Sequence, residues 1–308
     1  MILCCGEALI DMVPSTSVDG DTCFVPKAGG AVFNTAIALG RLGADVGLFT
    51  GVSNDFLGRI LHDELTASNV QTRHLVTRDA PSSLAFVELN KGQAQYTFYT
   101  DNAADASLTA AEVPADLTDV TALFFGGISL CTDPTATTMQ AVMTAQSANC
   151  VTMIDPNIRP SFISDKATYR ARLFDMIGHS DILKISDEDL NWLVPEINSI
   201  EAQLAAFVDD DKLVFVTKGA DGADAYLGTQ KVASADAKSV KVVDTIGAGD
   251  TFNAAILHVL AARGSFRDPT HFTPSITAIQ AALDLAIATA AITVSRVGAN
   301  PPWAAEIE

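Results

Sequence analysis

The sequence predicts an α/β protein with a mostly parallel central sheet covered by helices on both faces. Six short runs are almost entirely apolar or β-branched, and longer segments with helical spacing separate them. Continuous apolar strands that alternate with helices are typical of a parallel sheet buried on both sides. The six predicted strands are Ile2–Cys5, Val46–Thr50, Ala122–Phe125, Val151–Ile154, Ile182–Ile185 and Leu213–Thr217.

Two regions break this alternation of strands and helices. Ser15–Pro26 is polar and rich in turn-forming residues, while Leu84–Leu89 and Ala94–Tyr99 alternate as two strands around Asn90–Gln93, which is a hairpin signal. Because such strands fall outside the parallel sheet, they predict a small β-sheet lid over one of its edges. A hairpin without a function is the alternative.

The length of the chain bears on its domain organisation. A chain of 308 residues is long for one core, so one large domain with an appendage, or two domains, is the starting expectation. Hydrophobic residues make up 48% and charged residues 18%, which is the balance of a globular protein. We see no repeat, low-complexity tract or linker, and therefore predict a single domain over residues 1–308, with a lid contributed by about 12–26 and 83–101.

The charge and cysteine content exclude several classes of partner. With 37 acidic and 19 basic residues the net charge is −18, which repels nucleic acid and anionic membranes. No apolar run reaches membrane-spanning length, and the N-terminus lacks the basic start of a signal peptide. Five cysteines without Cys-x-x-Cys spacing predict free thiols in a reducing cytoplasm, with the adjacent Cys4 and Cys5 on opposite faces of a strand. The five scattered histidines suggest no metal site.

A glycine-rich stretch late in the chain predicts a phosphate site. Asp244–Phe252 reads Asp-Thr-Ile-Gly-Ala-Gly-Asp-Thr-Phe; it follows the apolar run Ser239–Val243 and precedes a helical pattern that ends near Gly264. The glycines are therefore expected where a strand turns into a helix N-terminus. Free backbone N–H groups and the positive end of the helix dipole suit phosphate oxygens there.

Asp250 is the unusual residue of this stretch, because it places a carboxylate where an anion should bind. As a helix cap or first-turn residue it would be ordinary. As a general base beside an anion hole it would take a proton from an attacking hydroxyl. From the residues alone, capping is the favoured interpretation.

A second carboxylate, Asp11, closes the stretch Gly6–Asp11 after the first predicted strand. Ligands of open α/β sheets bind beyond the carboxyl ends of the strands, and a carboxylate can accept two hydroxyl hydrogen bonds. Asp11 is thus a candidate to grip a polyol. A solvated turn aspartate is the alternative.

These stretches resemble the two signatures of the ribokinase-like (PfkB) carbohydrate kinase family. Asp244–Asp250 resembles the C-terminal signature, and Gly29–Gly43 resembles the N-terminal one, in the family's order. The resemblance covers nearly the whole chain and implies a three-layer ribokinase-like fold with a β lid. It also implies transfer of the ATP γ-phosphoryl group to a sugar hydroxyl. In that reaction Asp250 is the base, and the N–H groups of Gly247, Ala248 and Gly249 stabilise charge on the phosphoryl group.

The resemblance also assigns the sugar site. Gly6–Asp11 and Asp155–Pro160 are similar to stretches of the fructokinase branch, which favours a primary hydroxyl of a ketohexose, most of all fructose, as the acceptor. One departure is Thr100, since fructokinases usually carry Arg at this lid position. The residues implied to bind the sugar are Asp11, Gly29, Gly30, Asn34 and Arg159.

Other functions stay open at this point. Within the family they are 2-keto-3-deoxygluconate kinase, ribokinase and nucleoside kinase. Outside catalysis the alternative is a silent sugar-binding regulator, against which the intact Gly-Ala-Gly-Asp argues. A dinucleotide oxidoreductase lacks the Gly-x-Gly-x-x-Gly that should follow the first strand.

The nucleotide and ion sites are likewise implied by resemblance. The loop Thr217–Gly222 resembles the family's loop over the nucleotide phosphates, and the nucleotide-binding set is Lys184, Thr217, Gly219, Gly222 and Gly249. Lys184 and Arg159 are equally acceptable as surface cations. Asp189 stands where relatives organise water around Mg²⁺, although an acidic helix start explains it as well.

A monovalent-cation loop is the last implied site. Its walls are the stretch that contains Asp244 and Ile246 and the stretch Thr293–Ala299, with Thr293, Arg296 and Gly298 as members. The expected ligands are therefore ATP, Mg²⁺, a sugar and, as an open question, K⁺. A homodimer formed through the lid is the expected assembly to test.

Overall fold

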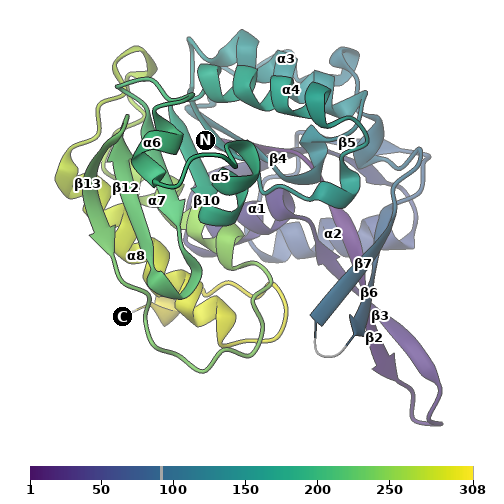
Figure 1. The fold of residues 1–308 in the computed structure, drawn as a ribbon. Helices are drawn as coiled ribbons and strands as arrows, with labels where there is room; N and C mark the ends of the chain where they lie inside the picture. Colours follow the sequence, from purple (N-terminus) through teal and green to yellow (C-terminus); the bar gives the residue numbers. More distant parts are fainter. Residues whose placement is uncertain (91–92, 308) are drawn as a thin grey trace.

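The structure is a computed structural model that describes residues 1–90 and 93–307. Its centre is a nine-stranded sheet, drawn in Figure 1, in which every neighbouring pair is parallel except those made by β12. All six predicted strands are present. In spatial order the strands are β13 (Gln230–Ala235), β12 (Ala223–Leu227), β11 (Leu213–Thr217), β10 (Ile182–Ser186), β9 (Val151–Asp155), β8 (Ala122–Gly126), β1 (Ile2–Cys5), β4 (Val46–Ser53) and β5 (Leu75–Arg78).

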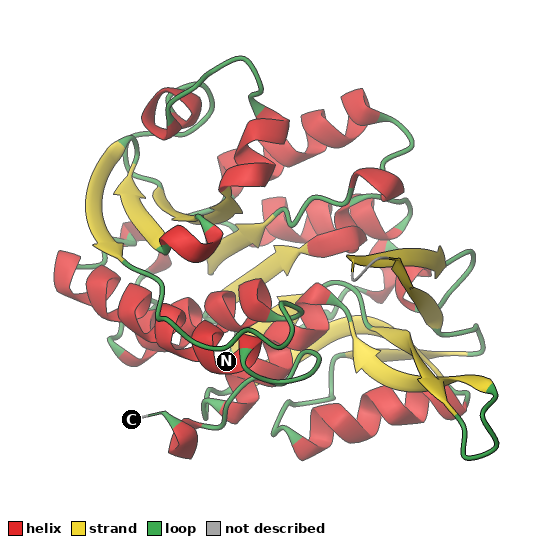
Figure 2. Ribbon diagram, turned by 60° about the horizontal axis from the view of Figure 1, so that its bottom comes forward, coloured by secondary structure: helices red, strands yellow, loops and turns green. Residues whose placement is uncertain are grey.

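Helices cover both faces of this sheet and make a three-layer molecule (Figure 2). One face packs against α1 (Ala31–Arg41), α2 (Phe56–Ala67), α7 (Ala248–Ala262) and α8 (Ile276–Val294). The other face packs against α3 (Thr135–Gln146), α4 (Lys166–His179), α5 (Asp187–Leu193) and α6 (Ile200–Leu204). Short 3₁₀ turns complete the chain: η1 (Asp105–Ser107), η2 (Ala110–Glu112), η3 (Gly127–Leu130), η4 (Pro160–Phe162), η5 (Gly219–Asp221), η6 (Pro269–His271) and η7 (Ala304–Glu306).

The continuous apolar runs follow from this double covering. Along β1, Ile2 and Cys4 enter the core under α1 and α7, while Leu3 and Cys5 enter the core under α3 and α4. Successive strand side chains point to opposite faces, so a strand buried on both sides has apolar residues at nearly every position. The two adjacent cysteines therefore lie on opposite faces as predicted, and all five cysteines are free thiols.

A second, four-stranded sheet projects from the body at the lower right of Figure 1. Its order is β3 (Thr22–Gly29), β2 (Leu9–Thr16), β6 (Ser83–Asn90) and β7 (Gln93–Tyr99). The predicted hairpin strands are therefore present as β6 and β7, paired antiparallel with Leu84 opposite Tyr99. Part of the predicted turn, residues 91–92, lies outside the described residues.

The second sheet also takes in residues that the sequence placed elsewhere. The polar region at 15–26 forms most of a β2–β3 hairpin, and β2 begins already at Leu9. Asp11 is consequently a residue of this smaller sheet, opposite Lys27 of β3 and Ala85 of β6, and not part of the loop after β1.

The strand predicted at Ser239–Val243 is absent from the structure. This segment has no regular secondary structure, and Val240, Val242 and Val243 are exposed. The N–H groups of Val243 and Asp244 both donate to the carbonyl oxygen of Val294, at the end of α8. The prediction was wrong because β-branched residues favour a strand only on a half-buried pleated surface, which this segment does not have.

The longest helix, α8, departs from the expectation that nothing reaches membrane-spanning length. Within the described part of the chain it is the one helix long and apolar enough to cross a membrane by length and composition. Gln280 and Asp284 interrupt its apolar sequence, which is why no continuous run was evident. Ile279 and Leu283 are fully buried and belong to the same core as α7, so α8 packs here as a core helix.

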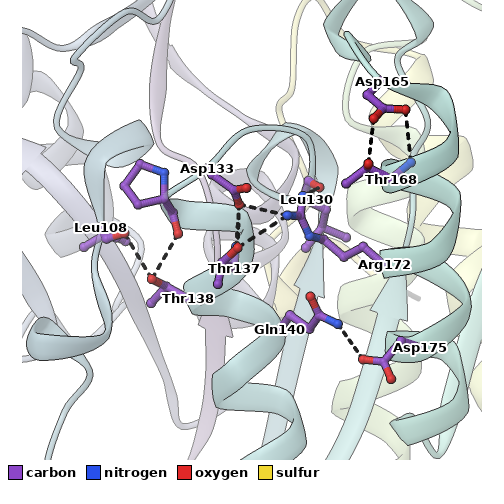
Figure 3. A network of polar contacts seen from close by, with 11 residues as sticks. Leu108, Leu130, Asp133, Thr137, Thr138, Gln140, Asp165, Thr168, Arg172 and Asp175 are labelled. Carbon is purple, nitrogen blue, oxygen red and sulfur yellow. Dashed lines mark hydrogen bonds and ion pairs between the residues drawn. The ribbon is translucent and has the colours of Figure 1, made fainter.

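A polar network ties α4 to the loop that follows β8 (Figure 3). The Arg172 guanidinium is largely buried and donates to the carbonyl oxygen of Leu130, to Asp133 Oδ1 and to Thr137 Oγ1. Asp133 also accepts from the N–H and hydroxyl of Thr137, at the start of α3. The network holds in place the η3 turn, whose Ser129 enters the candidate site.

Candidate active site

Polar side chains gather where the central strands end. Glu7 follows β1, Ser129 follows β8 and Asp155 ends β9, and all three are buried. Lys184 lies in β10, one strand further along the sheet. Because β1, β8, β9 and β10 are parallel, their carboxyl ends meet at one edge, where ligands of open α/β sheets bind.

The N-terminus of α7 forms the predicted anion-binding turn. Gly247 precedes the helix with φ 80° and ψ 0°, a left-handed conformation that favours glycine. A Cβ at this position would also lie 2.8 Å from Ala299 Cβ. The first N–H groups of a helix have no intrahelical acceptor, and that of Ala248 makes only a long bond of 3.4 Å to the carbonyl oxygen of Thr245. The turn can thus offer N–H groups to an anion.

Asp250 lies in the first turn of α7 but does not cap it. Its side chain is 7% exposed, and α7 has no side-chain cap. Asp250 Oδ2 instead accepts a hydrogen bond of 2.9 Å from Asn34 Nδ2. Burial raises the pKa of Asp250 to about 7; the charges of Asp155 and Glu7 add to the rise, while the Asn34 bond and Lys184 oppose it. A buried carboxyl group with such a pKa can accept a proton near neutral pH.

Glu7 holds the start of α1, which carries Asn34. Its Oε1 accepts from the N–H groups of Ala31, at 2.9 Å, and Val32, at 3.4 Å. Its Oε2 accepts from the N–H of Ser129 at 3.2 Å. Burial raises the pKa of Glu7, and these hydrogen bonds oppose the rise. Glu7 therefore supplies the cap that the helix lacks, since the N-cap residue of α1 is a glycine, Gly30.

Asp11 faces this same helix start. A Cβ at position 29 would lie 2.2 Å from Asp11 Oδ2, so only glycine at this position lets the carboxylate approach the backbone so closely. Burial raises the pKa of Asp11 to about 6. The structure thus brings together Asp11, Gly29, Gly30 and Asn34, and it joins the last of them to Asp250.

Lys184 reaches the N-terminus of α7 from the sheet. Its Nζ lies 3.0 Å from Asp155 Oδ2 and 3.2 Å from the position that a Cβ on Gly249 would take. Asn253, in the next turn of α7, donates to the same oxygen of Asp155 at 2.7 Å. Lys184 is therefore a buried ammonium group beside the anion-binding turn and not a surface cation.

The predicted phosphate loop follows β11, at some remove from this cluster. Thr217 is the last residue of β11, Gly219 begins the η5 turn and Gly222 follows it. Lys218 Nζ makes an ion pair of 3.0 Å with Asp224 Oδ2, which ties the loop to β12. Among the described residues, no hydrogen bond joins this loop to Asp250 or Lys184.

Asp189 belongs to the acidic helix start that the sequence offers as one interpretation. It lies in the acidic first turn of α5, where Ser186 caps the helix by accepting from the Asp189 N–H at 3.0 Å. Asp189 Oδ1 accepts from the N–H of Ile158 at 3.2 Å, and burial followed by the charge of Asp155 raises the pKa of Asp189 to about 6. Among the described residues, no three His, Cys, Asp or Glu side chains form a metal cluster.

The two walls of the predicted cation loop lie against each other. Asp244 Oδ1 accepts from the N–H of Ile246 at 3.1 Å, and Oδ2 accepts from the N–H of Gly298 at 2.9 Å. The hydroxyl groups of Thr293 and Thr251 are 3.0 Å apart. The side chain of Arg296 pairs with Glu306 near the C-terminus, at 2.6 Å, and so does not face Asp244.

Arg159, predicted to bind the sugar, lies outside the cluster. It is exposed, and its Nη1 donates to the carbonyl oxygens of Asn157 and Ile158, its own neighbours. Within the described part of the chain, no hydrogen bond or ion pair joins it to Asp11, Asn34 or Asp250.

One strand of the smaller sheet contacts this region. Phe98 of β7 packs edge-to-face on Phe162 of η4, with ring centroids 4.3 Å apart. Phe162 also lines a cavity of about 20 Å³, enough for about one water molecule. It is lined by Glu7, Thr100, Asp105, Ala106, Ile128, Ser129, Thr132, Thr135 and Phe162.

Four buried residues of this region were not assigned a role from the sequence. Asp155 and Glu7 stood within motifs, but their partners were not evident. Asn253 looked like an ordinary helical residue. Asp105 accepts a hydrogen bond of 2.5 Å from Ser83 Oγ, and burial raises the pKa of Asp105 to about 7. For Glu7 and Asp155 the sequence signal is a charged residue next to an apolar strand. Many solvent-exposed charged residues give the same signal.

Comparison with known proteins gives consistent matches over the full chain. Residues 1–306 match the family of pfkB carbohydrate kinases. A fructokinase from Rhizobium leguminosarum bv. trifolii is 48% identical over 258 residues, which cover 83% of this chain and 78% of the relative.

Solved structures agree in fold. A fructokinase from Xylella fastidiosa with bound ATP superposes with a TM-score of 0.83 at 29% identity and covers 97% of this chain and 93% of that one. A double mutant of the fructokinase from Vibrio cholerae O395, in a form with fructose, ADP and potassium ion bound, has a TM-score of 0.82 at 26% identity with the same two coverages, 97% and 93%.

Proposed function

Because the chain belongs to the pfkB family of carbohydrate kinases, we propose that it is an ATP-dependent fructokinase. The reaction transfers the γ-phosphoryl group of ATP to a primary hydroxyl group of fructose. The observation that carries this proposal is Asp250, a buried carboxyl group held by Asn34 at the N-terminus of α7. Such a group stands between the candidate sugar residues and an anion-binding turn.

Asp250 acts as the general base. The sugar is held by Asp11, Gly29, Gly30 and Asn34, so that the attacking hydroxyl donates to the Asp250 carboxylate. A pKa of about 7 allows a fraction of the enzyme to carry the ionised base at neutral pH and still lets Asp250 accept the proton. Because the carboxylate is buried, it needs no solvent reorganisation to do so.

The N-terminus of α7 stabilises the negative charge on the transferred phosphoryl group. The N–H groups of Gly247, Ala248 and Gly249, together with Lys184 Nζ, face the position of the γ-phosphoryl oxygens. Phosphoryl transfer depends mainly on positioning and charge neutralisation, so this small set is sufficient. It also offsets the repulsion that a net charge of −18 exerts on ATP. The loop with Thr217, Gly219 and Gly222 binds the nucleotide further out.

Asp189 is the residue we assign to Mg²⁺. Its carboxylate is a hard oxygen donor beside Asp155, and Mg²⁺ is commonly bound through one or two carboxylates together with waters and phosphate oxygens. Bound Mg²⁺ would neutralise charge on the phosphates. For K⁺, the loop of Asp244, Ile246, Thr293 and Gly298 is the candidate, and the potassium in the Vibrio cholerae structure supports testing it.

Fructose is favoured over the other family substrates by two observations. The relative that is 48% identical is a fructokinase. Thr100 at the wall of the cavity lined by Phe162 is uncharged, so this wall offers no cation to an acidic sugar such as 2-keto-3-deoxygluconate. The test is ADP release from ATP over a panel of fructose, 2-keto-3-deoxygluconate, ribose and adenosine. Fructose should give the highest kcat/KM, and a higher value for any other acceptor would replace the substrate assignment.

We also propose a cytoplasmic homodimer formed through the lid. Phe24, Phe86 and Tyr99 stack edge-to-face across the second sheet at centroid distances of 5.0 and 5.6 Å, and Phe24 and Tyr99 are 41% and 61% exposed. An exposed aromatic row suits contact with a second copy. Light scattering should give twice the monomer mass, and Phe24→Lys should reduce it to one monomer. A monomeric wild-type protein would refute the dimer.

A further inference from the structure

Three buried residues from three different elements share one carboxylate oxygen. Asp155 at the end of β9, Lys184 in β10 and Asn253 in α7 are 1%, 5% and 1% exposed. Asp155 Oδ2 accepts from Lys184 Nζ at 3.0 Å and from Asn253 Nδ2 at 2.7 Å. Asn253 Oδ1 is buried without a hydrogen-bond partner within the described part of the chain.

The burial of the Asp155–Lys184 ion pair is energetically unfavourable and calls for an explanation. Taking both charges out of water costs several kcal/mol, and replacing such a pair by apolar residues is often neutral for stability or even favourable. The pair is therefore poorly explained as a device for stability alone. What it does achieve is placement, since it directs a flexible lysine side chain, with three N–H donors, to within 3.2 Å of a Cβ position on Gly249.

We propose that Asp155 and Asn253 are positioning residues that hold Lys184 Nζ against the γ-phosphoryl group during transfer. One N–H of the ammonium group is committed to Asp155, which leaves two for phosphate oxygens at the start of α7. Asn253 holds the Asp155 carboxylate from the side of α7. Contacts from both the sheet and the helix therefore restrain Lys184 Nζ to one position. This inference rests on the proposed kinase function and adds two residues, Asp155 and Asn253, that orient the Lys184 ammonium group.

The same pair acts on the base through charge. The groups that face Asp250 are Asn34 of α1, Lys184, Asp155 and Glu7. Asp155 and Glu7 raise the pKa of Asp250, whereas Lys184 and the Asn34 bond lower it. Removing one member of the pair should therefore move the acid limb of the pH profile in a direction set by which member is lost. The pH profile thus reports the charges beside Asp250, while kcat and the double variant report the positioning of Lys184.

The experiment compares Lys184→Met, Asp155→Asn, Asn253→Ala and the double variant of the first two. Lys184→Met should lower kcat about 100-fold, the loss expected for one charge-stabilising donor, and leave the KM for sugar nearly unchanged. Asp155→Asn should lower kcat about 10-fold alone and by much less in the Lys184→Met background, because it acts through the lysine. Asn253→Ala should lower kcat in the same direction by a smaller factor. The acid limb of kcat/KM should move to lower pH in Asp155→Asn and to higher pH in Lys184→Met.

A matched control is Lys212→Met. It removes another buried lysine, which directly precedes β11 at the amino ends of the strands and whose Nζ donates to the Ser180 carbonyl oxygen. It should change stability but not kcat. If Lys184→Met and Lys212→Met behave alike, or if the two charge losses at 155 and 184 simply add, the positioning role is refuted. The double variant carries no buried unpaired charge, so it keeps the test valid if a single variant folds poorly. A wild-type protein that phosphorylates no sugar would instead refute the proposed function.

Discussion

Replacing Asp250 by Asn separates catalysis from stability, because the substitution should lower one and raise the other. The carboxyl group is 7% exposed, and its pKa is raised from 3.8 to about 7, chiefly by burial. An aspartate whose pKa is higher in the folded than in the unfolded state binds its proton more tightly when folded. The resulting penalty on folding is absent below pH 3.8 and is complete above pH 7.

The size of the effect follows from the shift. A pKa rise of about three units corresponds to about 4 kcal/mol, at about 1.4 kcal/mol per unit, as an upper limit at pH 8. The amide that replaces the carboxyl group cannot ionise, and its oxygen can still accept from Asn34. We expect Asp250→Asn to raise the free energy of unfolding by about 2 kcal/mol at pH 8, and Tm by roughly 3 °C, with little gain near pH 4. Turnover should fall about 10²- to 10⁴-fold.

The assays are thermal unfolding at pH 4, 6 and 8 and turnover with saturating sugar and ATP. Asp55→Asn is the control of opposite sign. Although partial burial opposes it, hydrogen bonds from Gly58, Ser53 and Ser82 lower the pKa of Asp55, so its contribution to stability is present above its unfolded pKa and is lost as pH falls. Asp55→Asn should destabilise most at pH 8. Loss of stability in Asp250→Asn at pH 8, or turnover close to wild type, would refute the role of Asp250 as a buried base and restore the capping interpretation.

Three further substitutions probe the sugar side of the site. Asp11→Ala should weaken sugar binding by about 2–3 kcal/mol, the value of one or two charged hydrogen bonds, and leave ATP binding unchanged; calorimetry showing equal losses would contradict this. Glu7→Gln turns an amide N–H toward the N–H groups of α1 or Ser129, so it should lower Tm and raise the KM for sugar, and an unaltered KM would show that α1 is held without it. Thr100→Arg adds a cation to the cavity wall and should move the kcat/KM ratio toward 2-keto-3-deoxygluconate by about 10-fold or more; an unmoved ratio would remove position 100 from specificity.

The sequence was sufficient for the strands because their pattern is local. An apolar run that is buried on both faces needs no knowledge of its partners, and β1, β8 and β11 were all predicted within one residue of their ends. Ser239–Val243 is also rich in valine but is not a strand; the N–H groups of Val243 and of the following Asp244 bond to the end of α8. Exposure of this segment depends on packing, which composition does not record.

The candidate site likewise contains residues that a local motif indicates and residues whose contacts depend on the fold. The sequence singles out Gly247 and Asp250 because both lie in one contiguous motif. The partners of Asp250 and Lys184 were not found, because Asn34 lies 216 residues before Asp250 and Asp155 lies 98 residues before Asn253. Arg159 was placed in the site by its motif, yet its guanidinium bonds to its own backbone at the surface. Contacts between distant segments depend on the sheet order, which only the folded structure provides.

The most direct measurement of the proposed function is phosphate transfer from γ-³²P-labelled ATP to fructose by the purified protein. The predicted result is a fructose phosphate labelled at a primary hydroxyl group, formed in equal amounts with ADP. In parallel assays, kcat/KM should be higher for fructose than for 2-keto-3-deoxygluconate. Release of labelled inorganic phosphate without sugar phosphate, or a higher kcat/KM for the keto acid, would contradict it.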